Sequence, residues 1–208
     1  MKIKPFAESS EQNKEPILVI LQKEFDKPGT VLEIGGGTGQ HAVYFSSELP
    51  HLVWQPTEKA GELPGICLWM EEAGLSNIHE PVELDVSTHP WELDAMDMVF
   101  SANTVHIMSW PEVECMFQGI GNVLRVGGKF CLYGPFNYDN VYTSDSNAQF
   151  DVWLKDHDPK SGIRNFENLD QLAQQVGMSL HKDYEMPANN RILVWKKVSS
   201  QSPGPGNW

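Results

Sequence analysis

The sequence predicts an α/β fold in which a mostly parallel sheet is covered by helices on both faces. Short apolar runs typical of buried strands alternate along the chain with longer segments of helical periodicity. Near the end, two apolar runs are separated by only a short polar turn, which predicts a terminal antiparallel hairpin. With 208 residues, 40% of them hydrophobic, the chain is long enough to bury a full core around one sheet.

The elements follow one another in a regular order. Residues 1–12 show no clear periodicity and are expected to be loosely ordered, and Pro16 suits the first turn of a helix. The expected strands are Val31–Ile34, Leu52–Gln55, Pro81–Val86, Asp97–Ala102 and Lys129–Tyr133, then Met178–Glu185 and Ile192–Lys197 as the hairpin. The expected helices cover the segments after residue 40, Pro64–Ala73, 110–124, about Ala148–Leu154, and 169–176.

Local signals support several of these boundaries. Ser109 and Glu112 have the spacing of a capping box at a helix start. Gly74 is placed to end a helix in the left-handed conformation, and Gly127-Gly128 predicts a turn before the fifth strand.

Composition narrows the class of protein. A formal net charge of −13, with no cluster of Lys and Arg to offset it, argues against a nucleic-acid partner. No run of 18 apolar residues is present and the N-terminus lacks an apolar signal segment, so we expect no membrane insertion and no secretion. Cys67, Cys115 and Cys131 form no zinc-type or redox-type pair, which fits a reducing cytoplasm.

The stretch Val31–His41 contains the strongest local motif. An apolar run with one carboxylate, Glu33, ends in glycines at positions 35, 36, 37 and 39 and opens into a helical pattern. Glycines let a ligand approach the backbone because they lack a Cβ and tolerate positive φ. Free N–H groups and the helix dipole favour acceptors or negative charge. We therefore expect a small ligand here.

Three kinds of glycine loop are possible. A phosphate-binding P-loop is excluded because no lysine follows these glycines. The dinucleotide pattern G-x-G-x-x-G/A is met by Gly37–Ala42, which leaves an NAD-linked oxidoreductase open. The pattern acid-x-Gly-x-Gly-x-Gly is met by Glu33, Gly35, Gly37 and Gly39, and it also accounts for the acid. It resembles motif I of the class I S-adenosylmethionine-dependent methyltransferases.

Polar side chains recur at the expected carboxyl ends of the strands, where a doubly wound sheet binds its ligand. Glu58 follows the glycines at about the spacing of a ribose-binding acid and could accept two ribose hydroxyls. Asp85 could accept the adenine amine, with Leu84 and Val86 against the ring. Glu33 would polarise the loop or face the methionine amino group, or would be a buried carboxylate that ties the loop.

His106, Asn103 and Tyr133 are the expected catalytic residues. Methyl transfer is an in-line displacement in which the protein chiefly positions the nucleophile. A neutral histidine can remove a proton from an oxygen or nitrogen nucleophile, and Asn103 can orient the nucleophile or hold the cofactor's amino group. Carboxylates and amides at 139–145 fit a polar loop, so no metal is expected. Further residues that could line an acceptor pocket are Tyr138, Asn147, Asp151 and Arg164.

Taken as a set, these segments are similar to the domain-of-unknown-function 938 family, the methyltransferase-like protein 26 family. The resemblance covers nearly the whole chain, from 13–18 to 186–190, and implies a seven-stranded, Rossmann-like class I methyltransferase fold that binds S-adenosylmethionine. The segments that carry it between these ends are 39–42, 54–56, 84–86, Asn103 with His106, 133–136, Asn147 with 150–151, 158–159 and 162–164.

The resemblance also implies pocket roles for a set of polar residues. These are Asn13, His41, Gln55, Tyr133 and Arg164, of which His41 and Gln55 are counted here as cofactor-binding. The sequence departs from the family at two places. Thr57-Glu58 stands where relatives usually have Ser-Asp. Ser161-Gly162 and Asn165 stand where they often have Trp-Gly and Asp, within the acceptor lid.

The leading hypothesis is an S-adenosylmethionine-dependent methyltransferase with a small-molecule acceptor. It places a single domain over residues 1–198, in which 1–28 form a lid segment and helix and 134–165 an insertion over the acceptor pocket. The alternative is a non-catalytic S-adenosylmethionine-binding module that acts through a protein partner, for which a disordered tail over 199–208 would be one contact.

Overall fold

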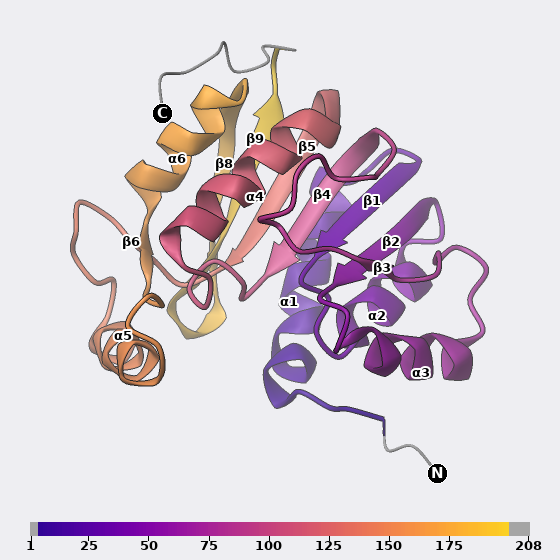
Figure 1. Ribbon diagram of the computed structural model, residues 1–208, viewed down its shortest axis with the longest axis horizontal. Coiled ribbons are helices and arrows are strands. Elements are labelled where there is room, and N and C mark those ends of the chain that lie inside the picture. Colours follow the sequence, from indigo (N-terminus) through magenta and orange to yellow (C-terminus); the bar gives the residue numbers. More distant parts are fainter. Residues whose placement is uncertain (1–3, 200–208) are drawn as a thin grey trace.

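The computed structural model describes residues 4–199, and its central feature is a seven-stranded sheet (Figure 1). Its strands are β1 (Gly29–Ile34), β2 (Leu52–Glu58), β3 (Val82–Glu83), β4 (Met96–Ala102), β5 (Leu124–Gly134), β8 (Met178–Met186) and β9 (Asn190–Lys197). The strand order is β3-β2-β1-β4-β5-β9-β8. Neighbours from β3 to β5 are parallel, and β9 is antiparallel to β5 and to β8. The mostly parallel sheet with a terminal hairpin is therefore confirmed.

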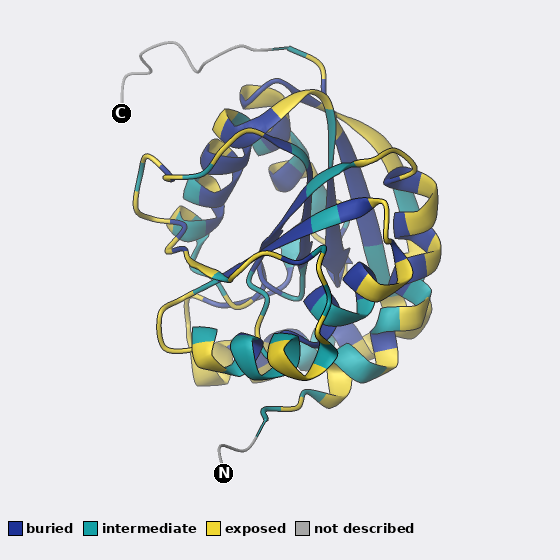
Figure 2. Ribbon diagram, turned by 90° about the vertical axis from the view of Figure 1, so that its right-hand side faces the viewer, coloured by how far each residue is buried: buried dark blue, intermediate teal, exposed yellow. Residues whose placement is uncertain are grey.

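Helices cover both faces of this sheet, as predicted. The helices are α1 (Glu8–Glu24), α2 (Gln40–Glu48), α3 (Leu63–Ala73), α4 (Trp110–Val123), α5 (Asp145–His157) and α6 (Phe166–Gln175). One apolar core packs α1 and α2 on the sheet, and a second packs α4 and α6 on the other face. Figure 2 shows the buried residues gathered in the strands and on the helix surfaces that face them.

The insertion between β5 and α6 lies at one end of the sheet. It contains α5 and a two-stranded parallel ladder of β6 (Phe136–Asn137) and β7 (Arg164–Asn165). In Figure 1, α5 lies apart from the two layers of helices that cover the sheet. Its Phe150 ring is 5.3 Å from the His106 ring, so the insertion contacts the loop that follows β4.

The alternation of side chains along β1 explains the position of the acid before the glycines. Val31 packs in the core under α1 and α2, whereas Leu32 and Ile34 pack in the core under α4 and α6. Because successive side chains of a strand point to opposite faces, Glu33 lies on the same face as Val31. Only 1% of Glu33 is exposed, so this carboxylate is inside the protein.

The start of the chain differs from expectation. The segment 8–12 was expected to be loose, but α1 begins at Glu8 and Pro16 lies inside the helix. A tertiary contact, and not local periodicity, orders this turn, because the Asn13 side chain is buried against His41. The capping box at Ser109, the left-handed Gly74 and the hairpin turn at 187–190 are as predicted. The expected tail begins at Ser199. Its remaining residues, 200–208, lie outside the described part of the chain.

Two strands also have other bounds than expected. β3 holds only Val82 and Glu83; the Leu84 N–H still donates to the Glu58 carbonyl (2.9 Å), and a turn then begins at Asp85, which accepts the Ser87 N–H (2.9 Å). β5 begins before the expected Gly127-Gly128 turn, and its pairing with β4 shifts register there. Gly127 has a φ of +89°, so the glycines form an irregularity within the strand and not a separate loop.

Candidate functional site

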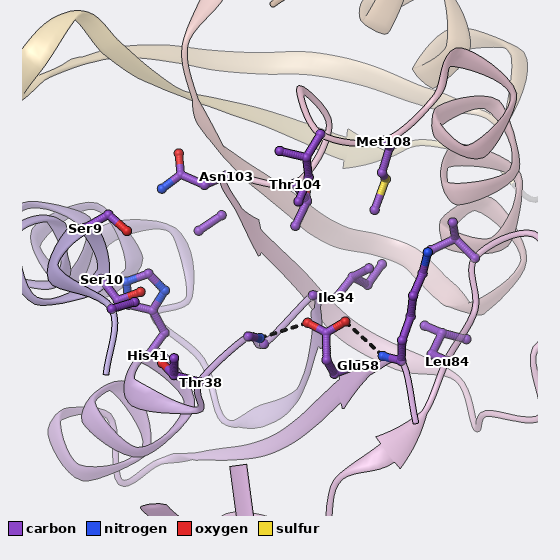
Figure 3. Close-up of a pocket in the computed structure, with 18 of the residues that line it drawn as sticks. Ser9, Ser10, Ile34, Thr38, His41, Glu58, Leu84, Asn103, Thr104 and Met108 are labelled. Atoms are coloured by element: carbon purple, nitrogen blue, oxygen red, sulfur yellow. Dashed lines mark hydrogen bonds between the residues drawn. The ribbon is translucent and has the colours of Figure 1, made fainter. Parts of the chain in front are cut away.

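A cavity of about 350 Å³ lies at the carboxyl ends of β1, β2 and β4 (Figure 3). The glycine loop and Glu58 form part of its wall, and Asn103 and Thr104 face them from the end of β4. Ala7, Ser9 and Ser10 close it from the N-terminal segment. The volume is within the range of small-ligand sites, and the location is the one where doubly wound sheets bind ligands.

The glycine loop after β1 has a shape that other residues cannot adopt easily. Gly35, Gly37 and Gly39 have φ values of +72°, +55° and +91°. A Cβ at Gly35 would lie 2.5 Å from Thr104 Cγ2, and one at Gly39 only 2.8 Å from Ile66 Cα. A Cβ at Gly37 would meet nothing within 4 Å, although Gly37 lines the cavity. The outer glycines therefore pack the loop closely, while the middle one leaves its backbone open to the cavity.

Glu58, the last residue of β2, joins the second strand to this loop. Its Oε2 accepts a hydrogen bond from the Gly37 N–H (2.9 Å), and its Oε1 accepts one from the Lys59 N–H (2.8 Å) (Figure 3). A carboxylate has about four acceptor positions, so two hydrogen bonds leave capacity for a ligand. The arrangement can therefore receive hydroxyl groups next to the glycine backbone.

An apolar part of the wall adjoins Glu58. Leu84, Val86, Ile34 and Met108 line it from three different segments, and Figure 3 shows Leu84 near Glu58. Asp85 is exposed between two buried neighbours, and its Oδ1 accepts the Ser87 N–H (2.9 Å). Asp85 is thus at the rim and not in the cavity wall. A flat apolar ring with a polar edge fits such a surface.

Glu33 supports the loop from behind and does not line the cavity. Its Oε2 accepts a hydrogen bond from Trp54 Nε1 (2.8 Å). Burial raises the pKa of Glu33 to about 7, with the Glu58 charge adding to the rise and the Trp54 hydrogen bond opposing it. The sequence left more than one role open for Glu33, and in the structure it is the buried carboxylate that supports the loop.

His41 and Tyr133 are connected by Asn13 of α1. His41 Nε2 is 2.7 Å from Asn13 Oδ1, and His41 lines the cavity. Burial lowers the pKa of His41 to about 4. Burial also raises the pKa of Tyr133, which the hydrogen bond with Asn13 opposes. Gln55, in contrast, is turned away, because its Nε2 donates to the Pro56 and Glu80 carbonyls.

Asn103 and His106 follow β4 but lie at different depths. Asn103 has a φ of +58°, its N–H donates to the Tyr133 carbonyl (2.9 Å), and it lines the cavity. His106 is 5% exposed, and its Nδ1 has no hydrogen-bond partner among residues 4–199. Burial, aided by the Arg164 charge, lowers the pKa of His106 to about 4. His106 and Tyr133 are therefore outside the cavity wall that Asn103 forms.

Arg164 ties the insertion to the loop after β4. Its guanidinium donates to the carbonyls of Val105 (3.0 Å), Lys160 (2.8 Å) and Met108. Asp151 of α5 also anchors the insertion, because its Oδ1 accepts the Ile163 N–H (2.7 Å). These residues hold the site's supporting segments in place and do not line the cavity.

Sequence reasoning missed several cavity residues. Ser9 and Ser10 had no recognisable motif, since their place depends on how α1 packs. Lys59 belongs to no recognisable motif, yet its ammonium is 3.5 Å from Glu112 Oε1, and both residues line the cavity. Ile107 and Met108 could have been suspected because apolar residues directly follow His106.

Two other kinds of feature are absent from the described part of the chain. Between residues 4 and 199, no helix has the length and apolar character needed to cross a bilayer. The same part of the chain contains no group of three or more His, Cys, Asp or Glu side chains arranged to hold a metal ion.

The chain is similar to named methyltransferases over much of its length. It is 25% identical over 182 residues to "Sterol methyltransferase-like 3" of Botryococcus braunii, which is 84% of this chain and 45% of that protein. It is 27% identical over 128 residues to the chloroplastic 2-methyl-6-phytyl-1,4-hydroquinone methyltransferase of Arabidopsis thaliana, or 61% and 36% of the two chains. The chain thus spans less than half the length of these relatives.

Solved structures show the same fold. An O-methyltransferase family protein from Burkholderia thailandensis superposes with a TM-score of 0.80 at 14% identity, covering 93% of this chain and 58% of that one. CalO1, a methyltransferase in calicheamicin biosynthesis solved with S-adenosylhomocysteine (SAH) bound, superposes with a TM-score of 0.73 at 17% identity, covering 91% and 55%. The model of the family described as "Protein of unknown function (DUF938)" matches residues 4–197, so the chain belongs to that family.

Proposed function

We propose that this protein transfers a methyl group from S-adenosylmethionine to a small-molecule acceptor. The observation that carries the proposal is the hydrogen bond between Gly37 and Glu58 on the wall of a cavity whose adjoining surface is apolar. A ribose needs the carboxylate, an adenine needs the apolar surface, and an amino acid tail needs the open glycine backbone. The fold shared with methyltransferases supports the same ligand.

The residues present fit S-adenosylmethionine. Glu58 would receive the ribose hydroxyls, Leu84 and Val86 would pack on the adenine, and Gly35 and Gly37 would let the tail approach. Asp85 at the rim would accept the adenine amine, and Asn103 would meet the tail from the opposite side. Glu33 and Gln55 would act through the loop and through β2, since neither lines the cavity. The bound sulfonium would supply an activated methyl group.

The acceptor would be held where Asn103 meets His106 and Tyr133. Asn103 would orient the nucleophile, and neutral His106 would accept its hydrogen, because burial keeps the imidazole uncharged at neutral pH. Tyr133 would act through Asn13 and His41, the second of which lines the cavity. The names of the relatives support a small-molecule acceptor, since a sterol-type and a hydroquinone methyltransferase are among them.

The N-terminal segment would serve as a lid over the cofactor side. Trp69 Nε1 donates to the Pro5 carbonyl (2.8 Å), and Lys4 Nζ lies 3.7 Å from the Trp69 ring centre. The Ala7 N–H donates to Gln40 Oε1 at the start of α2 (2.6 Å). These contacts fasten residues 4–7 beside Ser9 and Ser10, which line the cavity, so the ligand would enter when they release.

Transfer of a labelled methyl group tests the proposal. The protein is incubated with S-[methyl-³H]adenosylmethionine and separately with the low-molecular-mass and the protein fractions of a cell extract. The proposal expects label in a small molecule, and loss of that label with Glu58→Ala. Label in protein alone, or no binding of either adenosyl ligand to the folded protein, would contradict it.

A further inference from the structure

Gln40, the first residue of α2, joins three segments of the chain through its side chain. Only 3% of Gln40 is exposed. Its Oε1 accepts hydrogen bonds from the Ala7 N–H (2.6 Å) and from Thr38 Oγ1 (3.0 Å), and its Nε2 donates to Glu11 Oε2 (3.5 Å). Because a backbone N–H can only donate, the amide oxygen of Gln40 must face Ala7, which leaves the amide nitrogen for the Glu11 carboxylate. The partners therefore fix the side chain in one orientation.

Two of these partners, Ala7 and Thr38, line the cavity. Ala7 precedes α1 as its N-cap residue and belongs to the N-terminal segment that closes the cavity. Thr38 directly follows Gly37, whose N–H donates to the Glu58 carboxylate (2.9 Å). Three successive hydrogen bonds thus connect Glu58 with Gly37, Thr38 with Gln40, and Gln40 with Ala7. A ligand that rests on Glu58 and the Gly37 backbone would contact the same loop that holds the Gln40 side chain.

The attachment of α1 as a whole rests on other residues. Ile17 and Leu21 are fully buried in the core that α1 shares with α2, and Asn13 Oδ1 is 2.7 Å from His41 Nε2. These contacts lie further along the helix than its first turn. Gln40 instead holds Ala7 and Glu11, where the helix begins beside the cavity. Gln40 therefore fixes the part of the chain that covers the cavity.

We propose that Gln40 is a positioning residue that couples closure of segment 4–10 to occupation of the glycine loop, so that a bound adenosyl ligand and the closed segment stabilise each other. The inference rests on the proposed function and deepens it, because it assigns the control of cofactor access. Such a coupling is reciprocal. If the ligand fastens Ala7, then release of Ala7 weakens the ligand by the same factor.

Hydrogen exchange at the Ala7 N–H tests the coupling directly. The exchange rate is measured by NMR on ¹⁵N-labelled protein with and without saturating SAH. In the wild type, SAH should slow exchange at Ala7 about fivefold or more. Gln40→Met keeps the length of the side chain and removes both hydrogen-bonding groups. In this variant Ala7 should exchange at the same rate with and without SAH, and SAH affinity should fall about fivefold or more.

Gln12→Met is the matched control for this substitution. Gln12 is exposed on α1, and its Nε2 donates to Glu8 Oε1 (3.0 Å) on the same helix. The control therefore makes the same chemical change near the start of α1 without touching the contact between Gln40 and Ala7. It should keep the wild-type affinity for SAH and the wild-type response of Ala7. An equal loss in Gln12→Met and Gln40→Met would overturn the assignment to Gln40.

An exchange of charge between Gln40 and Glu11 separates positioning from packing. Gln40→Glu keeps oxygens for Ala7 and Thr38 but places a carboxylate against the Glu11 carboxylate, so SAH binding should weaken. Adding Glu11→Gln returns an amide donor to the pair. The double variant should recover most of the lost affinity and the slowing of Ala7 exchange by SAH. A double variant no better than Gln40→Glu overturns the coupling.

The wild type alone decides if the Gln40 variants do not fold. Exchange at Ala7 that stays the same while SAH binds overturns the coupling and leaves the proposed function intact. Equal SAH affinity in the wild type and in folded Gln40→Met does the same. Absence of SAH binding to the folded wild type overturns the proposed function, and the coupling with it.

Discussion

The proposed cofactor half of the cavity and the proposed acceptor region behind Asn103 are built in different ways. The cofactor half consists of backbone, with the glycine loop and the end of β2 joined by the Gly37–Glu58 hydrogen bond. The proposed acceptor region consists of side chains from distant segments behind Asn103, where His106 after β4 meets Phe150 of α5 and lies near Gly134 of β5. The first half therefore depends mainly on the short glycine motif and the end of the next strand, whereas the second forms only when distant segments of the folded chain meet.

Substitutions in the glycine loop should give the largest effects and should separate packing from binding. Gly39→Ala forces a side chain against the backbone of α3 at a φ of +91°, so we expect a loss of about 3 kcal/mol in the free energy of unfolding. A Cβ at Gly37 would lie in open space, so Gly37→Ala adds only backbone strain. We expect it to lower the free energy of unfolding by about 1 kcal/mol. Urea denaturation measures both, and equal losses would contradict the distinction. Both variants should lose SAH binding.

Glu33 should give the cofactor half a pH dependence of stability. Its folded pKa of about 7 lies above the ordinary value of 4.5, so its stabilising contribution is complete below pH 4.5 and is lost as the pH rises through 7. The full loss is on the order of 3 kcal/mol. Glu33→Gln keeps an oxygen for Trp54 and removes the ionisation, so it should be more stable than the wild type at pH 8 but not at pH 4.5. Parallel pH profiles of the two proteins would contradict this.

His41 should act in the opposite direction. Its folded pKa of about 4 lies below the ordinary 6.5, so its contribution is complete above pH 6.5 and is lost as the pH falls through 4. The stabilising contribution of Glu33 grows as the pH falls over much of the same range. The two effects therefore partly cancel in the wild type. We expect the His41 loss, up to about 3 kcal/mol, to appear in Glu33→Gln and to be missing from the double variant with His41→Gln, which keeps only the similar contribution of His106, whose pKa is also about 4. A single slope shared by both variants would exclude His41 as its source.

The architecture was predictable because its determinants are local. The alternation of strands and helices, the Ser109–Glu112 cap and the hairpin turn each depend on a few neighbouring residues, and the structure has all of them. The glycine positions likewise depend on φ at one residue each. Glu58 and Asn103, at the ends of two strands, could also be predicted as cavity residues, since parallel strands bring their carboxyl ends to one edge.

The remaining features depend on tertiary contacts. The early start of α1 follows from Asn13 against His41, a contact across 28 positions of sequence. Whether Glu33 faces the ligand or the loop is decided by Trp54 on the neighbouring strand. His106 is 95% buried behind Asn103 because Phe150 and Arg164 arrive from the insertion. No pattern within one segment contains this information.

The smallest expected effect concerns the N-terminal lid. Trp69→Phe removes the hydrogen bond to the Pro5 carbonyl and weakens the contact with Lys4. We therefore expect the free energy of unfolding to fall by about 1 kcal/mol. Since the lid would cover the cofactor side only when fastened, SAH should dissociate several-fold faster, which stopped-flow displacement measures. Trp153→Phe on exposed α5 is the control and should leave the rate unchanged. An unchanged rate with Trp69→Phe would contradict the lid.

Calorimetric titration with SAH tests the central claim most directly. We expect one SAH molecule to bind each wild-type chain in competition with S-adenosylmethionine and not with NAD. Glu58→Ala, which removes the carboxylate beside Gly37, should weaken SAH binding at least tenfold without unfolding the protein. Folded wild-type protein that binds NAD and not SAH, or a Glu58→Ala variant that binds SAH as tightly as the wild type, would contradict the account.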